Sequence, residues 1–189
     1  MKNFAKYLLV MIIPLAVLLS RPVIPLLTLA FGQEVKLATV PFDPRDFFRG
    51  DYAELSFEIE NVSAALISPN LRTKLDNERD DNDDYWSEPY GETDVYVSLK
   101  PGEAGIYSAA LVSDAPLPDG VYVRGKMRKY PHPNSSGMIR INYGSSLSRF
   151  YVKENTGSEL EEAARKGKIH AAAKVWNGHI ALDKIEIKE

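Results

Sequence analysis

The chain has 189 residues, of which 44% are hydrophobic and 26% are charged, and its formal net charge is -3. This length leaves room for one sizeable domain and a short accessory segment. The balanced charge argues against a nucleic-acid partner, and the composition is that of a folded protein. Because the chain has no cysteine, disulfides, thiolate metal sites and a cysteine nucleophile are excluded.

A long apolar segment opens the chain. Between Phe4 and Phe31 its charged residues are Lys6 and Arg21 alone. A helix from Phe4 to Ser20 would be about 25 Å long, and one that continued to Phe31 would exceed the roughly 30 Å of a hydrocarbon layer. We therefore predict a membrane anchor in residues 1–32 that spans at about 4–20, or as far as 31, with Pro14 bending the helix without breaking it.

The charges around this segment predict its orientation. Lys2 and Lys6 precede the apolar run, so the positive-inside rule places the N-terminus in the cytoplasm and the rest of the chain outside the inner or cytoplasmic membrane. Arg21 would then reach the outer headgroups. The alternative is a cleaved secretory signal, because Thr28-Leu29-Ala30 offers small residues near a cleavage site. The length of the apolar region and its arginine favour an uncleaved signal-anchor.

Residues 33–189 are predicted to form one exported, mainly β domain. The segment from Val35 to Val40 alternates like a half-buried strand, and the segment from Asp51 to Ile59 places Ala53, Leu55, Phe57 and Ile59 on one face. Further β-prone runs, separated by Pro-Gly, Asp-Gly and Ser-Ser-Gly, predict a meander or small barrel; they lie at 95–99, 106–113, 121–127 and 138–143.

Three other segments complete the predicted domain. Residues 68–91, with an Asp-rich run and little apolar content, are expected to be a solvated acidic loop without a bound metal, because the EF-hand spacing is missing. Ser158 and Glu161 form a capping box that predicts a short helix near 158–167. At the C-terminus, Asn177-Gly178 predicts a hairpin that joins 169–176 to 179–187.

The apolar pattern also predicts the register of this hairpin. Val175 should face Ile180 and Ala173 should face Leu182, after which the apolar phase slips to Ile185 and Ile187. Such a slip requires one additional residue in one strand, so we expect a bulge near Asp183 or Lys184.

A dense group of ionisable and turn-forming residues precedes the second predicted strand. It consists of Asp43, Pro44, Arg45, Asp46, Arg49, Gly50 and Asp51. Asp-Pro favours a turn, glycine accepts backbone conformations closed to other residues, and carboxylates can hold arginine side chains in bidentate pairs. These residues therefore predict a structural lock at the strand entry. The alternative is that Arg45 and Arg49 bind an anion or lipid headgroup.

The next residues carry a family resemblance. Gly50-Asp51-Tyr52-Ala53-Glu54-Leu55-Ser56-Phe57 resembles the pattern Gly-Asp-Tyr-x-x-Leu-x-Tyr for which the GDYXXLXY family of membrane-anchored proteins is named. Phe57 replaces the last tyrosine and keeps its ring without the hydroxyl. The upstream Pro-x-Asp-Pro-Arg-Asp run behind a membrane segment is also similar to that of family members.

A second block extends the resemblance towards the C-terminus. Its residues are Tyr143, Gly144, Arg149, Phe150, Tyr151 and Glu154, with Lys153 where a proline is frequent in the family. The resemblance implies location and architecture more than activity, because the family has no established function. Members tend to be encoded near polytopic membrane proteins, which implies an accessory subunit.

These observations favour a non-catalytic module that docks to an integral membrane partner. Asp43 to Tyr52 and Tyr151 to Glu154 would form its docking surface. A hydrolase in which Asp51 and Glu154 face one another is a further alternative. No cofactor is expected, and no metal site, since no histidine has an i, i+4 partner or a nearby glutamate.

Overall fold

The computed structural model describes residues 2–40, 52–77, 91–128, 136–144, 147, 149–151 and 169–187. Its helices are α1 (Lys2–Ser20), α2 (Val23–Phe31) and α3 (Pro69–Asn77), with short 3₁₀ turns η1 (Glu58–Glu60), η2 (Ala64–Leu66) and η3 (Glu103–Gly105). Its strands are β1 (Gln33–Ala38), β2 (Tyr52–Glu54), β3 (Asn61–Ser63), β4 (Glu92–Pro101), β5 (Ile106–Ser113), β6 (Val121–Arg128), β7 (Met138–Asn142), β8 (Arg149–Tyr151), β9 (Ile169–Trp176) and β10 (His179–Ile187). The helix predicted near 158–167 lies outside the described residues.

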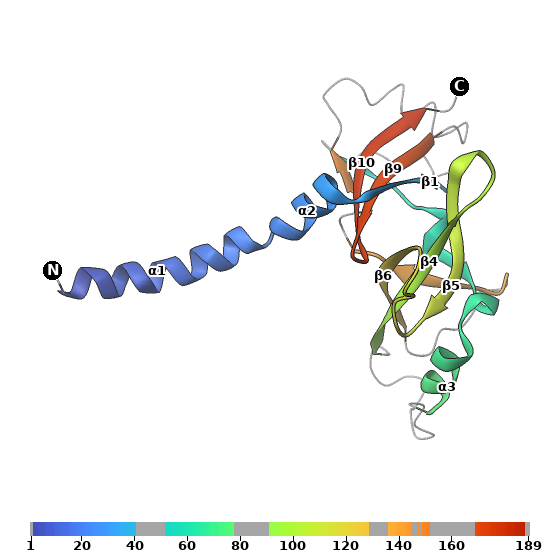
Figure 1. The fold of residues 1–189 in the computed structure, drawn as a ribbon, viewed down its shortest axis with the longest axis horizontal. Helices are drawn as coiled ribbons and strands as arrows, with labels where there is room; N and C mark the ends of the chain where they lie inside the picture. Colours follow the sequence, from blue (N-terminus) through green and yellow to red (C-terminus); the bar gives the residue numbers. More distant parts are fainter. Residues whose placement is uncertain are drawn as a thin grey trace.

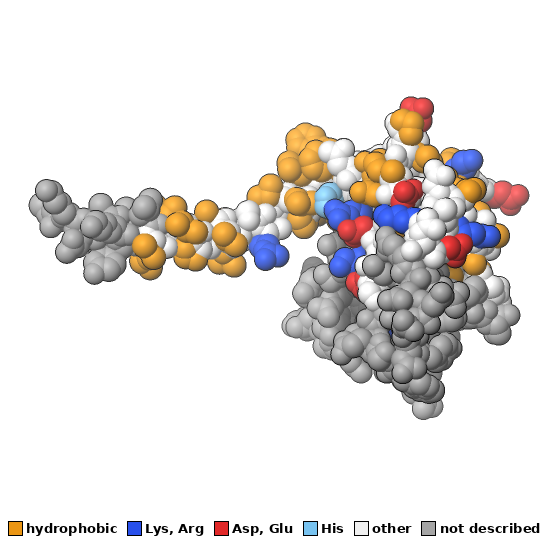
Figure 2. Space-filling model, turned by 90° about the horizontal axis from the view of Figure 1, so that it is seen from below, with side chains coloured by type: hydrophobic (Ala, Val, Ile, Leu, Met, Phe, Trp, Pro, Cys, Tyr) orange, Lys and Arg blue, Asp and Glu red, His pale blue; other side chains and the backbone are white. Residues whose placement is uncertain are grey.

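The two N-terminal helices form a rod that projects from a β-rich domain (Figure 1). Helix α1 continues through Pro14 as predicted. The rod turns at Arg21-Pro22, because proline has no N–H to continue the helical ladder. The segment from Val10 to Phe31 is apolar and long enough to cross a membrane, and all of its residues except Thr28 lie at least partly exposed. Figure 2 shows hydrophobic side chains along the described part of the rod.

Helix α2 joins this rod to the domain. It lies against β9 and β10 (Figure 1). Thr28 is fully buried there, and its hydroxyl donates a hydrogen bond to the Ile24 carbonyl at 2.8 Å. A Cβ at Gly32 would clash with the Thr28 carbonyl and lie 2.9 Å from the Lys174 Cβ. Glycine therefore permits the chain to pass from α2 into β1 in close contact with β9.

The domain is built on a curled eight-stranded sheet, a half-barrel with the strand order β10-β9-β1-β5-β4-β6-β7-β3. Strand β1 pairs parallel with β5 and antiparallel with β9. The N-terminal strand is therefore inserted between the C-terminal hairpin and the β4–β6 meander. Its inward residues Val35 and Leu37 are completely buried, so the segment that follows the rod lies in the core of the sheet.

The C-terminal hairpin confirms the predicted register. Ile180 is opposite Val175 and Leu182 is opposite Ala173. The register then shifts between Leu182 and Lys184, which is the predicted bulge. Asn177 and Gly178 both have positive φ, as a type I′ turn requires.

Two sequence predictions require correction. The strand expected at 51–59 ends at Glu54, and η1 occupies Glu58–Glu60. Leu55, Phe57 and Ile59 are nevertheless buried, as the alternation predicted. Burial alone does not establish a ladder, because a ladder also needs a neighbouring strand along its whole length.

The solvated loop expected at 68–91 begins instead with helix α3. The Ser68 hydroxyl accepts a hydrogen bond from the backbone N–H of Leu71 at 3.3 Å and caps the helix. Leu71 and Leu75 are one helical turn apart and both are buried. These two leucines give the segment a core-facing side that its high charge obscured. The acidic run at 78–84 lies outside the described residues.

In the curled sheet, β6 contacts the turn of the C-terminal hairpin. Val123 forms a parallel bridge with Gly178, and the backbone N–H of Arg124 donates to the Gly178 carbonyl at 2.7 Å. A Cβ at Gly178 would lie 2.9 Å from Cε2 of Tyr122. Only a residue without a side chain therefore fits this contact between distant strands.

We predict that Gly178→Ala destabilises the domain more than Gly105→Ala. Both glycines have positive φ, 79° and 74°, so both variants incur the left-handed backbone cost of about 1–2 kcal/mol. A Cβ at Gly105 meets nothing within 4 Å, so the additional loss in Gly178→Ala reports the contact with Tyr122. Guanidinium unfolding of the full chain in detergent, followed by circular dichroism, measures both; equal losses would mean that this contact contributes nothing.

Candidate functional site

The two sequence blocks that resemble the family pattern are paired in space. Strand β2 from the first block and β8 from the second form a separate antiparallel ribbon. Tyr52 is opposite Tyr151, Ala53 is opposite Phe150 and Glu54 is opposite Arg149. Residues about a hundred positions apart thus form one structural unit.

A second contact joins the blocks. The hydroxyl of Tyr143 donates a hydrogen bond to the carbonyl oxygen of Ile59 at 2.9 Å. Burial raises the pKa of Tyr143 well above its usual value, and the nearby carboxylate of Glu60 raises it further. The phenol therefore stays protonated and remains a donor. A buried carbonyl that lost this partner would cost about 1–3 kcal/mol, so Tyr143 has a structural role.

Other motif residues also have structural roles. Leu55 and Phe57 belong to the buried core, and Phe57 is 0% exposed. A tyrosine at this position would have to place its hydroxyl in the core, where an unpaired polar group is costly. Gly144 has a φ of 84°, and its N–H binds the side-chain oxygen of Asn142 at 2.8 Å. The blocks therefore stabilise the fold wherever the structure describes their side chains.

The remaining predicted site residues belong to segments that the structure does not describe. Asp43, Pro44, Arg45, Asp46, Arg49, Gly50, Asp51 and Glu154 lie outside the described residues. All of them except Glu154 lie between Val40 and Tyr52, which the structure does describe. The backbone N–H of Val40 donates to the Ser56 carbonyl at 2.9 Å, so the described residues on either side of 41–51 are hydrogen-bonded to one another.

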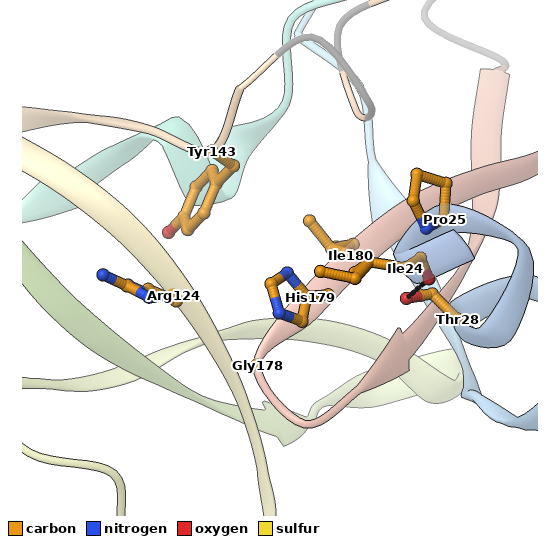
Figure 3. Close-up of a pocket in the computed structure, with 8 residues that line it drawn as sticks. All are labelled: Ile24, Pro25, Thr28, Arg124, Tyr143, Gly178, His179 and Ile180. Atoms are coloured by element: carbon orange, nitrogen blue, oxygen red, sulfur yellow. Dashed lines mark hydrogen bonds between the residues drawn. The ribbon is translucent and has the colours of Figure 1, made fainter. Parts of the chain in front are cut away.

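A pocket of about 120 Å³ lies where α2 meets the sheet (Figure 3). Ile24, Pro25 and Thr28 of α2 line one side, and Arg124 of β6, Tyr143 and residues 178–180 line the rest. Figure 3 shows the arginine and tyrosine across the pocket from the helix, with His179 between them. Sequence reasoning missed this pocket, because its residues come from four distant segments and share no motif.

Arg124 is the charged residue in the lining of this pocket. Its Nη2 is 2.8 Å from Oδ2 of Asp94, and both side chains are about half exposed. The hydrogen bond to Arg124 is the main reason why the pKa of Asp94 lies below its usual value. In the view of Figure 2, basic and acidic side chains lie close together on the domain. The Lys126–Glu92 pair, at 3.4 Å, joins the same two strands.

The described features are thus an apolar N-terminal rod, a curled β sheet and two distant sequence blocks that pair with one another. The chain matches the family model of the GDYXXLXY protein over residues 14–185, which is most of its length, and it therefore belongs to this family, as the resemblance predicted. No curated protein and no solved structure matches the chain. Both sequence blocks lie within the matched region. The family assignment does not indicate a biochemical activity.

Glu60 beside the Tyr143 contact provides a test of this region. Burial raises its pKa, while the charge of Arg140 and a backbone hydrogen bond with Phe57 act in the opposite direction. A raised folded-state pKa means that the carboxylate is less favourable in the fold than in the unfolded chain. Glu60 therefore contributes most to stability when its carboxyl is protonated. This contribution is fully present below the unfolded pKa of about 4.3 and is lost as the pH rises through the folded pKa.

We predict that Glu60→Gln is more stable than the wild type at pH 7 and equally stable below about pH 4. Thermal unfolding between pH 3.5 and 7.5 measures this difference. Glu58→Gln, at an exposed neighbour, should show no such pH-dependent gain. A loss of stability in Glu60→Gln at pH 7 would show that the attraction to Arg140 outweighs the cost of burial.

Proposed function

We propose that this chain is a single-pass membrane protein with a cytoplasmic N-terminus and an extracytoplasmic β domain that serves as a non-catalytic accessory module. The domain would dock to an integral membrane partner through the surface around β2 and β8. The observation that carries this proposal is the pairing of the two family blocks in one ribbon. This pairing gives the segments on either side of the ribbon a common, fixed base.

The apolar rod supports the membrane location. Helix α1 has 19 residues and would be about 28 Å long, close to the thickness of the hydrocarbon layer. Leu15, Leu18 and Leu19 are each more than half exposed on its surface. Such a surface is costly in water and favourable in lipid. Lys2 and Lys6 at its start favour a cytoplasmic N-terminus.

Helix α2 supports a domain held close to the bilayer. If α1 spans, α2 begins at the outer boundary, directly after Arg21. One side of α2 packs on β9 and β10 through Thr28, while Leu26 is 61% and Phe31 is 70% exposed. An amphipathic position in the headgroup region would cover these exposed residues. Gly32 then leads directly into β1, so no flexible linker separates the domain from the membrane.

The short chain distance between the pocket and the ribbon of β2 and β8 supports a partner in the membrane. Tyr143 lines the pocket beneath α2, and β8 begins at Arg149, six residues further along the chain. Six residues reach at most about 20 Å, so β8 begins within that distance of Tyr143 in the pocket lining. An integral membrane protein with outer loops of ordinary length could contact it. Arg45 and Arg49 precede β2 and supply charge for such a contact, or for the anion-binding alternative.

We predict that cysteine probes will report this arrangement, because the chain has no cysteine of its own. A fluorophore at Leu26→Cys in α2 should show blue-shifted emission and be quenched by lipids that carry a nitroxide near the headgroup. The control is Glu103→Cys in η3, between β4 and β5, on the side of the domain away from α1 (Figure 1). That probe should remain in water and react with a membrane-impermeant maleimide in intact cells.

Two results would contradict the arrangement. An aqueous spectrum for the Leu26→Cys probe would mean that α2 does not contact the bilayer. Labelling of Glu103→Cys only after cell lysis would mean that the domain is cytoplasmic. The two measurements are independent, so the orientation of the chain and the position of α2 are tested separately.

We predict that the chain co-purifies with a polytopic membrane protein after mild detergent extraction. The double variant Arg45→Gln/Arg49→Gln should lose this partner, because it removes the two arginines of the segment from Asp43 to Tyr52 that we propose docks to the partner. The control Arg72→Gln changes an exposed arginine of α3 and should retain it. A wild-type chain that elutes as a solitary monomer would refute the accessory role, and so would equal retention by both variants.

A further inference from the structure

The pocket between α2 and the sheet has one apolar side and one polar side. Ile24 and Pro25 of α2 and Ile180 of β10 supply hydrocarbon, whereas Arg124 and His179 supply nitrogen donors (Figure 3). Tyr143 also faces the pocket, but its hydroxyl is bonded to the Ile59 carbonyl. A ligand for this lining would combine a polar, negatively charged group with an adjoining hydrocarbon part.

Arg124 is suited to an anion despite its contact with Asp94. A guanidinium group has five N–H donors and keeps its charge at any pH relevant to proteins. The bond to Asp94 at 2.8 Å engages one of its nitrogens. The side chain is 51% exposed, which leaves room for an incoming oxygen. Asp94 holds the guanidinium in one direction through this charge-assisted hydrogen bond.

The backbone holds this donor in position relative to the helix. The N–H of Arg124 bonds to the carbonyl of Gly178 at 2.7 Å, and Gly178 directly precedes His179. His179 is exposed and lies opposite Trp176 across the hairpin turn. The hydrogen bond between β6 and this turn therefore brings Arg124 and His179 together in the lining of one pocket.

The size of the pocket limits the ligand. The pocket has a volume of about 120 Å³. This space accepts a phosphate group with a few attached carbons, and it is far too small for a complete lipid. Any acyl chains would have to leave the pocket along the exposed apolar side of α2, where Leu26 and Leu29 lie.

We propose that this pocket binds the phosphate headgroup of an anionic membrane lipid. The phosphate oxygens accept hydrogen bonds from Arg124 and His179, and the first carbons of the lipid contact Ile24, Pro25 and Ile180. The lipid source rests on the proposed position of α2 at the bilayer surface, because that position brings the pocket to the depth of the headgroups. The site is separate from Arg45 and Arg49, which lie in another segment of the chain.

The test uses the full chain in non-ionic detergent micelles, titrated with phosphatidylglycerol or phosphatidylcholine and examined by native mass spectrometry. We expect one phosphatidylglycerol to bind in preference to phosphatidylcholine. Arg124→Gln should weaken this binding at least about tenfold, which corresponds to about 1.4 kcal/mol. The matched control is Arg128→Gln, an exposed arginine on the same strand, which removes the same charge and should bind like the wild type.

A second variant keeps the test independent of the Arg124–Asp94 pair. Ile24→Trp fills the pocket from the helix side without altering its charge, and Ile24 is 45% exposed, so the fold should tolerate the larger ring. This variant should also lose the bound lipid. Equal effects of Arg124→Gln and Arg128→Gln, no effect of Ile24→Trp, or no preference between the two lipids would overturn the pocket as the site.

Competition identifies the source of the phosphate. Millimolar sodium phosphate or glycerol 3-phosphate should not displace phosphatidylglycerol if the hydrocarbon contacts contribute to binding. Displacement by these soluble phosphates would overturn the lipid assignment. Binding in micelles does not depend on the orientation of the chain in a cell, so failure here with Glu103→Cys still labelled from outside would refute the lipid site alone.

Discussion

Helix α2 has two different sides, one packed on the sheet and one exposed and apolar. The connection between the N-terminal rod and the domain depends on this helix. One side is packed on β9 and β10 through Thr28, and the other exposes large apolar residues. Because α2 passes through Gly32 directly into a buried central strand, the rod and the core of the domain are mechanically continuous. A force or tilt applied to the rod would act on β1 and, through its neighbours, on the whole sheet.

The described residues of the two family blocks stabilise the fold. Where their side chains are described, Leu55, Phe57, Tyr143 and Gly144 serve the core, a buried hydrogen bond and a turn. The ribbon of β2 and β8 and the Tyr143–Ile59 bond connect segments that flank the charged residues. A rigid base of this kind suits a docking surface, because fewer conformations are lost when a partner binds.

In the proposed arrangement, the pocket and the surface around β2 and β8 would give the domain two points of contact near the membrane. The pocket depends on the curl of the sheet, since the Arg124–Gly178 hydrogen bond brings β6 to the hairpin turn. The surface around β2 and β8 depends on the pairing of these two strands. A lipid in the pocket would hold the domain in one orientation on the bilayer, and the ribbon would then face a partner from a defined direction. Lipid binding and partner binding would support one another in this arrangement.

The sequence by itself determined the features that are encoded locally. The apolar rod, the Asn177-Gly178 hairpin and its bulge beside Asp183 follow from hydropathy, turn chemistry and alternation within a few neighbouring residues. The tertiary structure decided what depends on distant partners: β1 between β9 and β5, β2 against β8, helix α3 in place of a loop, and the pocket of Arg124 and His179. These contacts bring together residues far apart in the chain. Their free energy comes from burial that is shared by the two partners, so neither segment encodes it alone.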